Sequence, residues 1–487
     1  MTLATKPAPR RVRRPVRRSP IAAPLSAGLS WVFVAEALAA ALGFVALAYQ
    51  ARRLGPASFA RVEYAAAVAS WLLVLVRGGF DVIAYREAAR RPRLVRPLTD
   101  LLLGLRLASA GVGYLIVLAV AALIGPEGGP VVALAGLGLF ASVWVTDVGP
   151  RADGRLGWIA LAQFVRAIGT VAAVLSLVNG PADVVRAAYC LVLAEASAAL
   201  VPLALHTREH GFPRPKFRRR ATVVLARRGA VAGLSRFARV TLYGLDLLAL
   251  GWWLDDGLGE YAAARRVVYA LAAFGLVVPS ALGPSIAAAW ASGAGAARRR
   301  VGEVFSGLWS LSLPAAVGLG LTADRWMPAL FGASYRDGGP CLTLIAARLP
   351  WLLAAGTAQA VLVACRREDL GLRLVLGQLA LAAFAVPFAV ALAGPQGVGW
   401  AALAVETAGA IVGWALLARL GVAPGWFEQT GRALVGCLGL FAAVRLAGGA
   451  ALPLVVCAGA FGYLMAWRAA ARWMSLDGRG PEFEGVS

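Results

Sequence analysis

Arginine and tyrosine side chains recur at helical spacing inside segments that are otherwise strongly apolar. In one such segment Arg236, Arg239, Tyr243 and Asp246 follow one another at intervals of three, four and three residues, so they share one face of a helix. An arginine deep in an apolar segment is costly unless it faces protein, water or a counter-ion. Its guanidinium offers forked donors that match phosphate oxygens. The stripe therefore predicts a water-filled cationic cavity that suits an anionic cargo.

Two further stripes extend this predicted cavity. Tyr261, Arg265 and Tyr269 lie four residues apart in the next apolar segment, and Arg166 lies three residues after Gln163 in an earlier one. The alternative is that these charges form ion pairs that only hold helices together. The residues predicted to bind the cargo are Arg236, Arg239, Arg265, Arg166, Tyr243 and Tyr261.

Acidic residues lie at comparable depth in the apolar segments. Glu36, Asp246 and Glu406 are candidates for proton or sodium coupling, and each could equally be the partner in an ion pair. Arg77 and Asp81, four residues apart, are expected to form a structural ion pair on one helix.

The sequence predicts no metal, no cofactor and no catalytic residues. The two lysines, Lys6 and Lys216, lie outside any GxxxxGK[ST] loop, so ATP hydrolysis by that route is not expected. The five cysteines lack the spacing of metal ligands. His206 and His210 lie four residues apart without an evident third ligand. We expect a transporter and not an enzyme.

The elements that carry these residues are predicted to be membrane-spanning helices. Of 487 residues, 60% are hydrophobic and only 15% are charged, whereas a soluble domain has about 25% charged residues. The apolar residues form about fourteen segments of about twenty residues each, the length that crosses a ~30 Å hydrocarbon core as a helix. The predicted fold class is all-α, a polytopic membrane protein with about fourteen transmembrane helices.

The charge pattern predicts how these helices are oriented. The net charge is +23, and the arginines gather in alternate connecting segments. The positive-inside rule then places both the N-terminus and the C-terminus in the cytoplasm. Nucleic acid is not an expected partner, because no basic cluster belongs to a segment that could fold as a soluble domain.

A short internal sequence repeat predicts two pseudo-symmetric lobes of six helices each. Residues 54–59 and 257–261 are similar turns, each of which leads an aromatic residue into an alanine-rich segment. Repeats of six helices keep one orientation, so the lobes would be related by an axis along the membrane normal, with a cavity between them. The expected organisation is a basic, disordered cytoplasmic tail (1–28), the N-terminal lobe (29–205), a basic cytoplasmic loop (206–229), the C-terminal lobe (230–420), two extra C-terminal helices (432–473) and a cytoplasmic tail (474–487).

Several short motifs, in a fixed order along the chain, resemble those of the oligosaccharide-lipid flippases. This Wzx-type branch belongs to the superfamily that also holds the multidrug (MATE) exporters and the lipid II flippases, the MOP superfamily. The matching segments are ARRLGPASF (51–59), GFD with REAAR (79–90), Asp246 with YAAARRV (261–267), Pro284, LFGASY (330–335) and GVGWAA (397–402). The chain departs from the family pattern at Ala60, where Gly is usual, and at Arg366-Arg367, where a Gly-Arg turn is usual.

The resemblance implies a function that the residues alone do not give. It implies a V-shaped cationic cavity between two six-helix lobes, and alternating access that flips a polyprenyl-diphosphate-linked oligosaccharide, such as an O-antigen, capsule or exopolysaccharide repeat unit. The implied location is the bacterial plasma membrane, with membrane lipids and other polysaccharide-assembly membrane proteins as further partners. Among the predicted cargo contacts, only Arg265 and Tyr261 also lie on a matching motif.

Two alternatives stay open at this point. One is a MATE-like multidrug/proton or sodium antiporter, although a cation exporter would want carboxylates in its cavity. The other, from a different class, is a membrane glycosyltransferase or polysaccharide polymerase, which would need a larger outer loop than residues 324–339.

Overall fold

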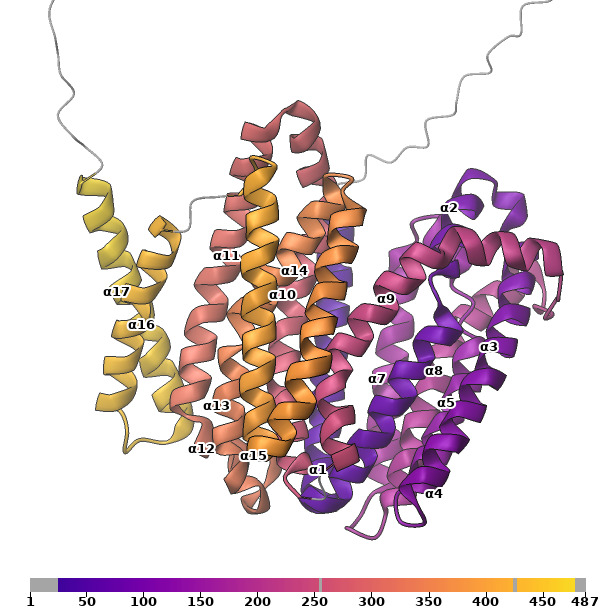
Figure 1. The fold of residues 1–487 in the computed structure, drawn as a ribbon, viewed down its shortest axis with the longest axis horizontal. Helices are drawn as coiled ribbons and strands as arrows, with labels where there is room; N and C mark the ends of the chain where they lie inside the picture. The colour runs from indigo at the N-terminus through magenta and orange to yellow at the C-terminus, as the bar shows by residue number, and fades with distance from the viewer. Residues whose placement is uncertain (1–24, 254–255, 424–426, 478–487) are drawn as a thin grey trace, which may run out of the picture.

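The structure is a computed structural model that describes residues 25–253, 256–423 and 427–477, and these residues form helices without a β-strand (Figure 1). Eight helical segments within them are long and apolar enough to cross a membrane. The all-α, polytopic membrane fold is therefore confirmed, while the number of about fourteen crossings stays a prediction.

The helices form two neighbouring groups, with a helix pair at one edge (Figure 1). The first group contains α2 (Phe80–Arg90), the 3-10 helix η1 (Pro92–Leu94), α3 (Val95–Ile124), α4 (Gly129–Gly136), α5 (Gly138–Val143), α6 (Val148–Ala152), α7 (Leu156–Leu177) and α8 (Val184–His210), and the long helix α1 (Leu25–Arg77) contacts helices of both groups. The second contains α10 (Leu258–Ser292), α11 (Ala294–Leu321), α12 (Ala323–Phe331), the 3-10 helix η2 (Ala333–Gly338), α13 (Gly339–Ala347), α14 (Leu349–Ala364) and α15 (Glu368–Arg419), and α9 (Arg219–Trp253) contacts α2 and α3 of the first group and α15 of the second. The edge pair is α16 (Phe427–Leu446) and α17 (Leu452–Asp477).

The two longest helices are each interrupted near their middle. Gly55 in α1 has φ 74°, and in α15 Ala393 and Gly394 leave helical geometry, with φ 53° at Gly394. Positive φ values favour glycine because it lacks a Cβ atom. Each long helix is thereby divided into two segments of membrane-spanning length, as the turn predicted at residues 54–59 requires for α1.

Residues 131–149 do not form a continuous helix. The chain forms α4 and α5, leaves helical geometry after Val143 and resumes as α6. The buried side chain of Arg106 donates from Nη1 to the carbonyl oxygens of Val143 at 3.5 Å and Val145 at 2.7 Å. The freed carbonyls are thus satisfied inside the protein, the condition for irregular backbone at membrane depth.

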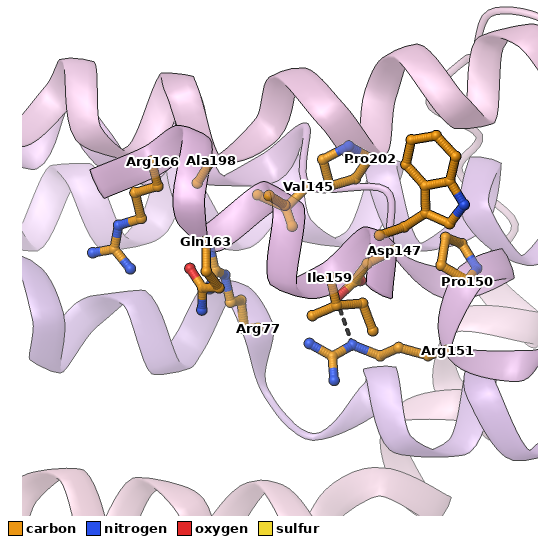
Figure 2. Close-up of a pocket in the computed structure, with 12 residues that line it drawn as sticks. Arg77, Val145, Asp147, Pro150, Arg151, Ile159, Gln163, Arg166, Ala198 and Pro202 are labelled. Atoms are coloured by element: carbon orange, nitrogen blue, oxygen red, sulfur yellow. Dashed lines mark hydrogen bonds and ion pairs between the residues drawn. The ribbon is translucent and has the colours of Figure 1, made fainter. Parts of the chain in front are cut away.

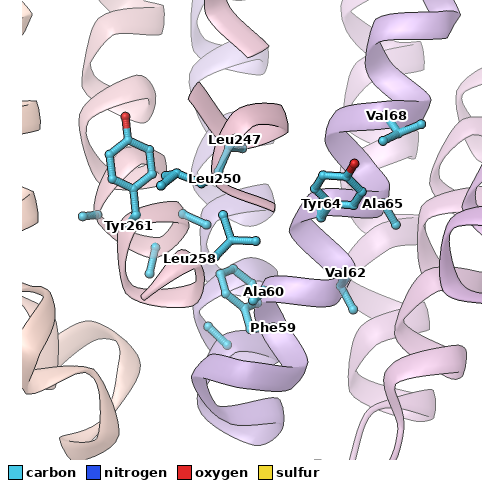
Figure 3. Packing of buried hydrophobic residues seen from close by; sticks show 14 of the residues in the cluster. Phe59, Ala60, Val62, Tyr64, Ala65, Val68, Leu247, Leu250, Leu258 and Tyr261 are labelled. Carbon is cyan, nitrogen blue, oxygen red and sulfur yellow. The ribbon is translucent and has the colours of Figure 1, made fainter. Parts of the chain in front are cut away.

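The two groups meet through tightly packed apolar and aromatic residues (Figure 3). Phe59 on α1 and Tyr261 on α10 are fully buried in this shared core. An ion pair also joins the groups, because Arg266 Nε on α10 lies 2.9 Å from Glu63 Oε2 on α1 and Arg266 Nη2 lies 3.2 Å from Glu63 Oε1. The turns at residues 54–59 and 257–261, which are similar in sequence, are therefore neighbours in the structure.

Candidate functional site: a charge cluster and an arginine-lined cavity

Four charged side chains, three of them buried and Arg265 half-buried, lie among α9, α10, α15 and the junction between α13 and α14. Asp246 Oδ2 lies 3.2 Å from Arg265 Nε and 3.4 Å from Arg348 Nη1, and Arg348 Nη2 lies 3.7 Å from Glu406 Oε1. Asp246 is 3% exposed and Glu406 is 1% exposed. Two carboxylates face two guanidiniums, so this buried cluster balances its own charge, which limits the cost of removing the four groups from water.

Two tyrosines contact Arg265 on α10, and a third contacts its counter-ion Asp246. Tyr261 donates its hydroxyl to Asp246 Oδ2 at 3.0 Å, and Arg265 Nη2 donates to the carbonyl oxygen of Tyr243. The Arg265 guanidinium also lies 4.4 Å from the ring centre of Tyr269. Tyr261 has no exposed surface. Tyr261 and Asp246 are therefore hydrogen-bonded to each other inside the protein and have no open side toward a cargo.

A cavity of about 650 Å³ lies between α9, α10 and α14. Tyr243, whose carbonyl oxygen accepts from Arg265 of the charge cluster, is one of the residues that line it. Arg239 lines it from α9, Gln359 from α14, and Arg366 from the turn that follows α14. None of the residues that line it is acidic. Within the described part of the chain, neither arginine forms an ion pair. An anionic group in this cavity would therefore meet two guanidiniums that carry no internal counter-charge.

The stripe predicted on one face of α9 runs from the surface into the protein. Arg236 and Arg239 are exposed, Tyr243 is half-buried and Asp246 is buried. Arg239 and Tyr243 line the cavity, whereas Arg236 is not among its lining residues. The structure thus brings together only part of the predicted stripe.

Arg166 lies in a separate, smaller cavity of about 70 Å³ in the first group of helices (Figure 2). Arg166 Nη2 and Arg77 Nη2 each lie 3.1 Å from the carboxylate of Glu195. Arg166 therefore shares a counter-ion with Arg77 and does not line the same cavity as Arg239.

The expected ion pair between Arg77 and Asp81 is wrong. Arg77 pairs with Glu195, and Asp81 Oδ1 instead accepts a hydrogen bond from Arg106 Nη2 at 2.7 Å. Helix α1 ends at Arg77 and α2 begins at Phe80, after Gly79 with φ 75°. The two residues do not share a continuous helix, so the spacing rule for helical pairs does not apply.

The candidates for ion coupling lie in different surroundings. Glu36 is exposed on α1, and Asp246 is neutralised by two arginines. Glu406 is buried, and among the described residues its Oε2 has no hydrogen-bond partner. Across the same residues no group of three histidine, cysteine or acidic side chains could hold a metal ion.

Two segments far apart in the sequence contact each other where the groups meet. Arg52 Nε donates to the carbonyl oxygen of Leu330 at 2.7 Å, and Tyr335 donates its hydroxyl to the carbonyl oxygen of Ala51 at 3.1 Å. The rings of Phe59 and Tyr335 lie 6.3 Å apart. The segments 51–59 and 330–335 thus close one end of the molecule.

Glycine at position 259 permits a close approach of α10 to α1 at this end, and we expect Gly259→Ala to disrupt it. A Cβ atom there would lie 2.2 Å from the carbonyl oxygen of Pro56, so α10 would have to move away from α1, at a cost of about 1–3 kcal/mol. The closed end should then label faster with a membrane-impermeant thiol reagent at Ser58→Cys. Gly43→Ala is the matched control, because nothing lies within 4 Å of the Cβ atom that this substitution adds; equal labelling in both variants would contradict this role.

Comparison with known proteins places this fold among membrane transporters. Residues 25–135 match the family described as "Polysaccharide biosynthesis protein". The lipid II flippase MurJ, in an inward closed conformation, superposes with a TM-score of 0.62 at 12% identity, over 92% of this chain and 99% of MurJ. An inward-facing multidrug resistance MATE transporter of the MOP superfamily gives 0.61 at 15% identity, over 78% of this chain and 94% of the transporter.

A further solved structure supports the same fold. The MATE multidrug transporter DinF-BH gives a TM-score of 0.58 at 16% identity, over 81% of this chain and 94% of that one. A comparison with curated protein sequences found no significant match. Residues 25–135 thus match the polysaccharide biosynthesis family, and the fold is similar to those of the MATE transporters and the MurJ flippase, as the order of the sequence motifs predicted.

Proposed function

We propose that this protein is a flippase that moves a polyprenyl-diphosphate-linked oligosaccharide across the bacterial plasma membrane. The observation that carries this proposal is the cavity of about 650 Å³ with Arg239 and Arg366 in its wall and no acidic residue among those that line it. Forked guanidinium donors suit a diphosphate, and they repel the organic cations that a drug exporter would carry. The match of residues 25–135 to the polysaccharide biosynthesis family supports a saccharide as part of the cargo.

The proposed mechanism is alternating access between two lobes. The N-terminal lobe would span residues 29–205 and the C-terminal lobe residues 230–420, with the segment 432–473 as two added helices. The diphosphate and sugars would enter the cavity from the cytoplasm while the prenyl chain stays in lipid. Release on the other side would require the contacts between the segments 51–59 and 330–335 to open. Gln359 lines the cavity and its Oε1 has no partner among the described residues, so it would accept from a sugar hydroxyl once the side chain turns toward the cavity.

Transport measurements in proteoliposomes test this proposal. A fluorescent polyprenyl-diphosphate oligosaccharide and a fluorescent organic cation are offered to the same wild-type vesicles, with protein-free vesicles as the baseline. We expect the saccharide cargo to reach the far leaflet and the cation to stay where it is. Transport of the cation alone would overturn the flippase assignment in favour of drug export, and transport of neither would overturn it as well.

Glu406 is the residue that we expect to couple transport to a proton gradient. Its Oε2 is buried without a partner among the described residues, so protonation would cancel the charge that faces Arg348. We expect Glu406→Gln to abolish the stimulation of transport by an imposed pH gradient while cargo binding stays unchanged. Glu303→Gln is the control, because Glu303 is exposed and pairs with Arg300 on its own helix. Full stimulation in Glu406→Gln would exclude Glu406 as the coupling group.

A further inference from the structure

Arg366 has a backbone conformation that side chains with a Cβ atom rarely adopt. It is the one residue other than glycine with a positive φ, 59°, in the described part of the chain. It follows the end of α14, where the Arg366 amide donates to the Val363 carbonyl at 3.0 Å and the Arg367 amide donates to the Leu362 carbonyl at 2.8 Å. This pair of hydrogen bonds defines the Schellman motif, in which Arg366 occupies the position that usually holds glycine.

The end of α15 shows the same motif with the usual residue. There the Gly421 amide donates to the Ala418 carbonyl at 2.9 Å, and the Val422 amide donates to the Leu417 carbonyl at 3.0 Å. Gly421 has φ 73°. A left-handed conformation is unfavourable for an L-residue with a Cβ atom and free of that cost for glycine. The turn itself therefore does not require arginine, and glycine would serve it better.

The position of the Arg366 side chain accounts for an arginine at this turn despite the unfavourable backbone conformation. It lines the cavity of about 650 Å³ together with Arg239 and makes no ion pair among the described residues. The next residue, Arg367, is also exposed but pairs with Asp369 at 3.4 Å and does not line the cavity. Strained backbone that persists at a cavity wall is typical of a functional position.

We propose that Arg366 is a cargo-binding residue that, together with Arg239, clamps the diphosphate of the lipid-linked saccharide. This inference rests on the proposed function and assigns the specificity for a phosphate-bearing cargo to the turn after α14. The left-handed backbone fixes the direction in which the side chain leaves the turn, so the guanidinium is presented to the cavity. The recognised group is a diphosphate, which free inorganic pyrophosphate also carries.

Arg366→Gly separates this role from a structural one. Glycine relieves the backbone strain, so we expect the thermal unfolding temperature in detergent to stay equal or rise. Loss of one charge-assisted contact should weaken cargo binding and slow transport by roughly ten- to a hundredfold. Arg366→Lys should restore part of the affinity, because it returns the charge without the fork. Arg367→Gly is the matched control and should bind and transport like the wild type.

Binding titrations with the lipid-linked oligosaccharide and with inorganic pyrophosphate distinguish the two sources of diphosphate. We expect the lipid-linked cargo to bind more tightly, and Arg366→Gly to weaken that binding. Tighter binding of pyrophosphate alone would overturn the assignment to the lipid-linked cargo. Wild-type binding and transport by Arg366→Gly, with transport lost in Arg239→Ala, would overturn the role of Arg366 and leave the proposed function standing. A wild-type protein that moves no lipid-linked saccharide would instead overturn the proposed function.

Discussion

We expect Arg239→Ala to lower the transport of a lipid-linked oligosaccharide by roughly ten- to a hundredfold, the loss expected for one charge-assisted contact to a phosphate. Arg239 is exposed on α9, lines the large cavity and forms no ion pair among the described residues. Because it has no internal partner to lose, the variant should keep the thermal stability of the wild type. Initial rates in proteoliposomes and unfolding in detergent measure the two effects separately.

A second exposed arginine of the same helix provides the control for this prediction. Arg227 lies on α9 and is not among the residues that line the cavity, so Arg227→Ala should transport like the wild type. If Arg239→Ala also transported at the wild-type rate, the cavity would not be the site at which the phosphates bind. An equal loss in both variants would point to a general effect of surface charge and would likewise contradict the account.

The largest effect on stability is expected at Asp246. This carboxylate accepts from Tyr261 and faces both Arg265 and Arg348, so Asp246→Asn leaves Arg348 with Glu406 alone and takes from Arg265 the carboxylate that it faces. Breaking a buried ion pair by removing one partner costs about 3–5 kcal/mol. We expect a marked fall in the thermal unfolding temperature and reduced yield of folded protein from membranes.

A double variant tests whether charge balance is the cause. Asp246→Asn combined with Arg348→Met removes one charge of each sign and should recover a large part of the lost stability, as seen when buried pairs are replaced together. Asp256→Asn is the control, because Asp256 is exposed, and it should leave unfolding unchanged. No recovery in the double variant would show that Asp246 stabilises the fold through its hydrogen bonds and not through charge.

Much of the fold could be predicted from the sequence because membrane-length apolar segments leave few choices. The turn at Gly55 was predictable from the short glycine- and proline-containing sequence 54–59, and Gly55 has a positive φ. The break after Val143 was not predictable, because it depends on Arg106, which comes from a distant helix and satisfies the freed carbonyls. Local sequence does not report such a contact.

The candidate site could be predicted in part, for a similar reason. Helical spacing identifies a common face of α9, and Arg239 and Tyr243 do line the cavity. The same spacing does not reveal where along that face the neighbouring helices begin to cover it. Asp246 belongs to this face, but it lies in the buried cluster and not in the cavity wall. Arg348 and Arg366 were not predicted as site residues. The signal for Arg366 was an arginine in a turn that usually holds glycine.

The diphosphate of the cargo is proposed to bind in the cavity lined by Arg239 and Arg366, and protection from labelling tests this most directly. The measurement is the rate of maleimide labelling at Ala360→Cys, a lining position, quantified at that site by mass spectrometry. We predict that the lipid-linked oligosaccharide slows this labelling several-fold, and that the protection disappears when Arg239→Ala is added. Unchanged labelling at saturating cargo would contradict the account.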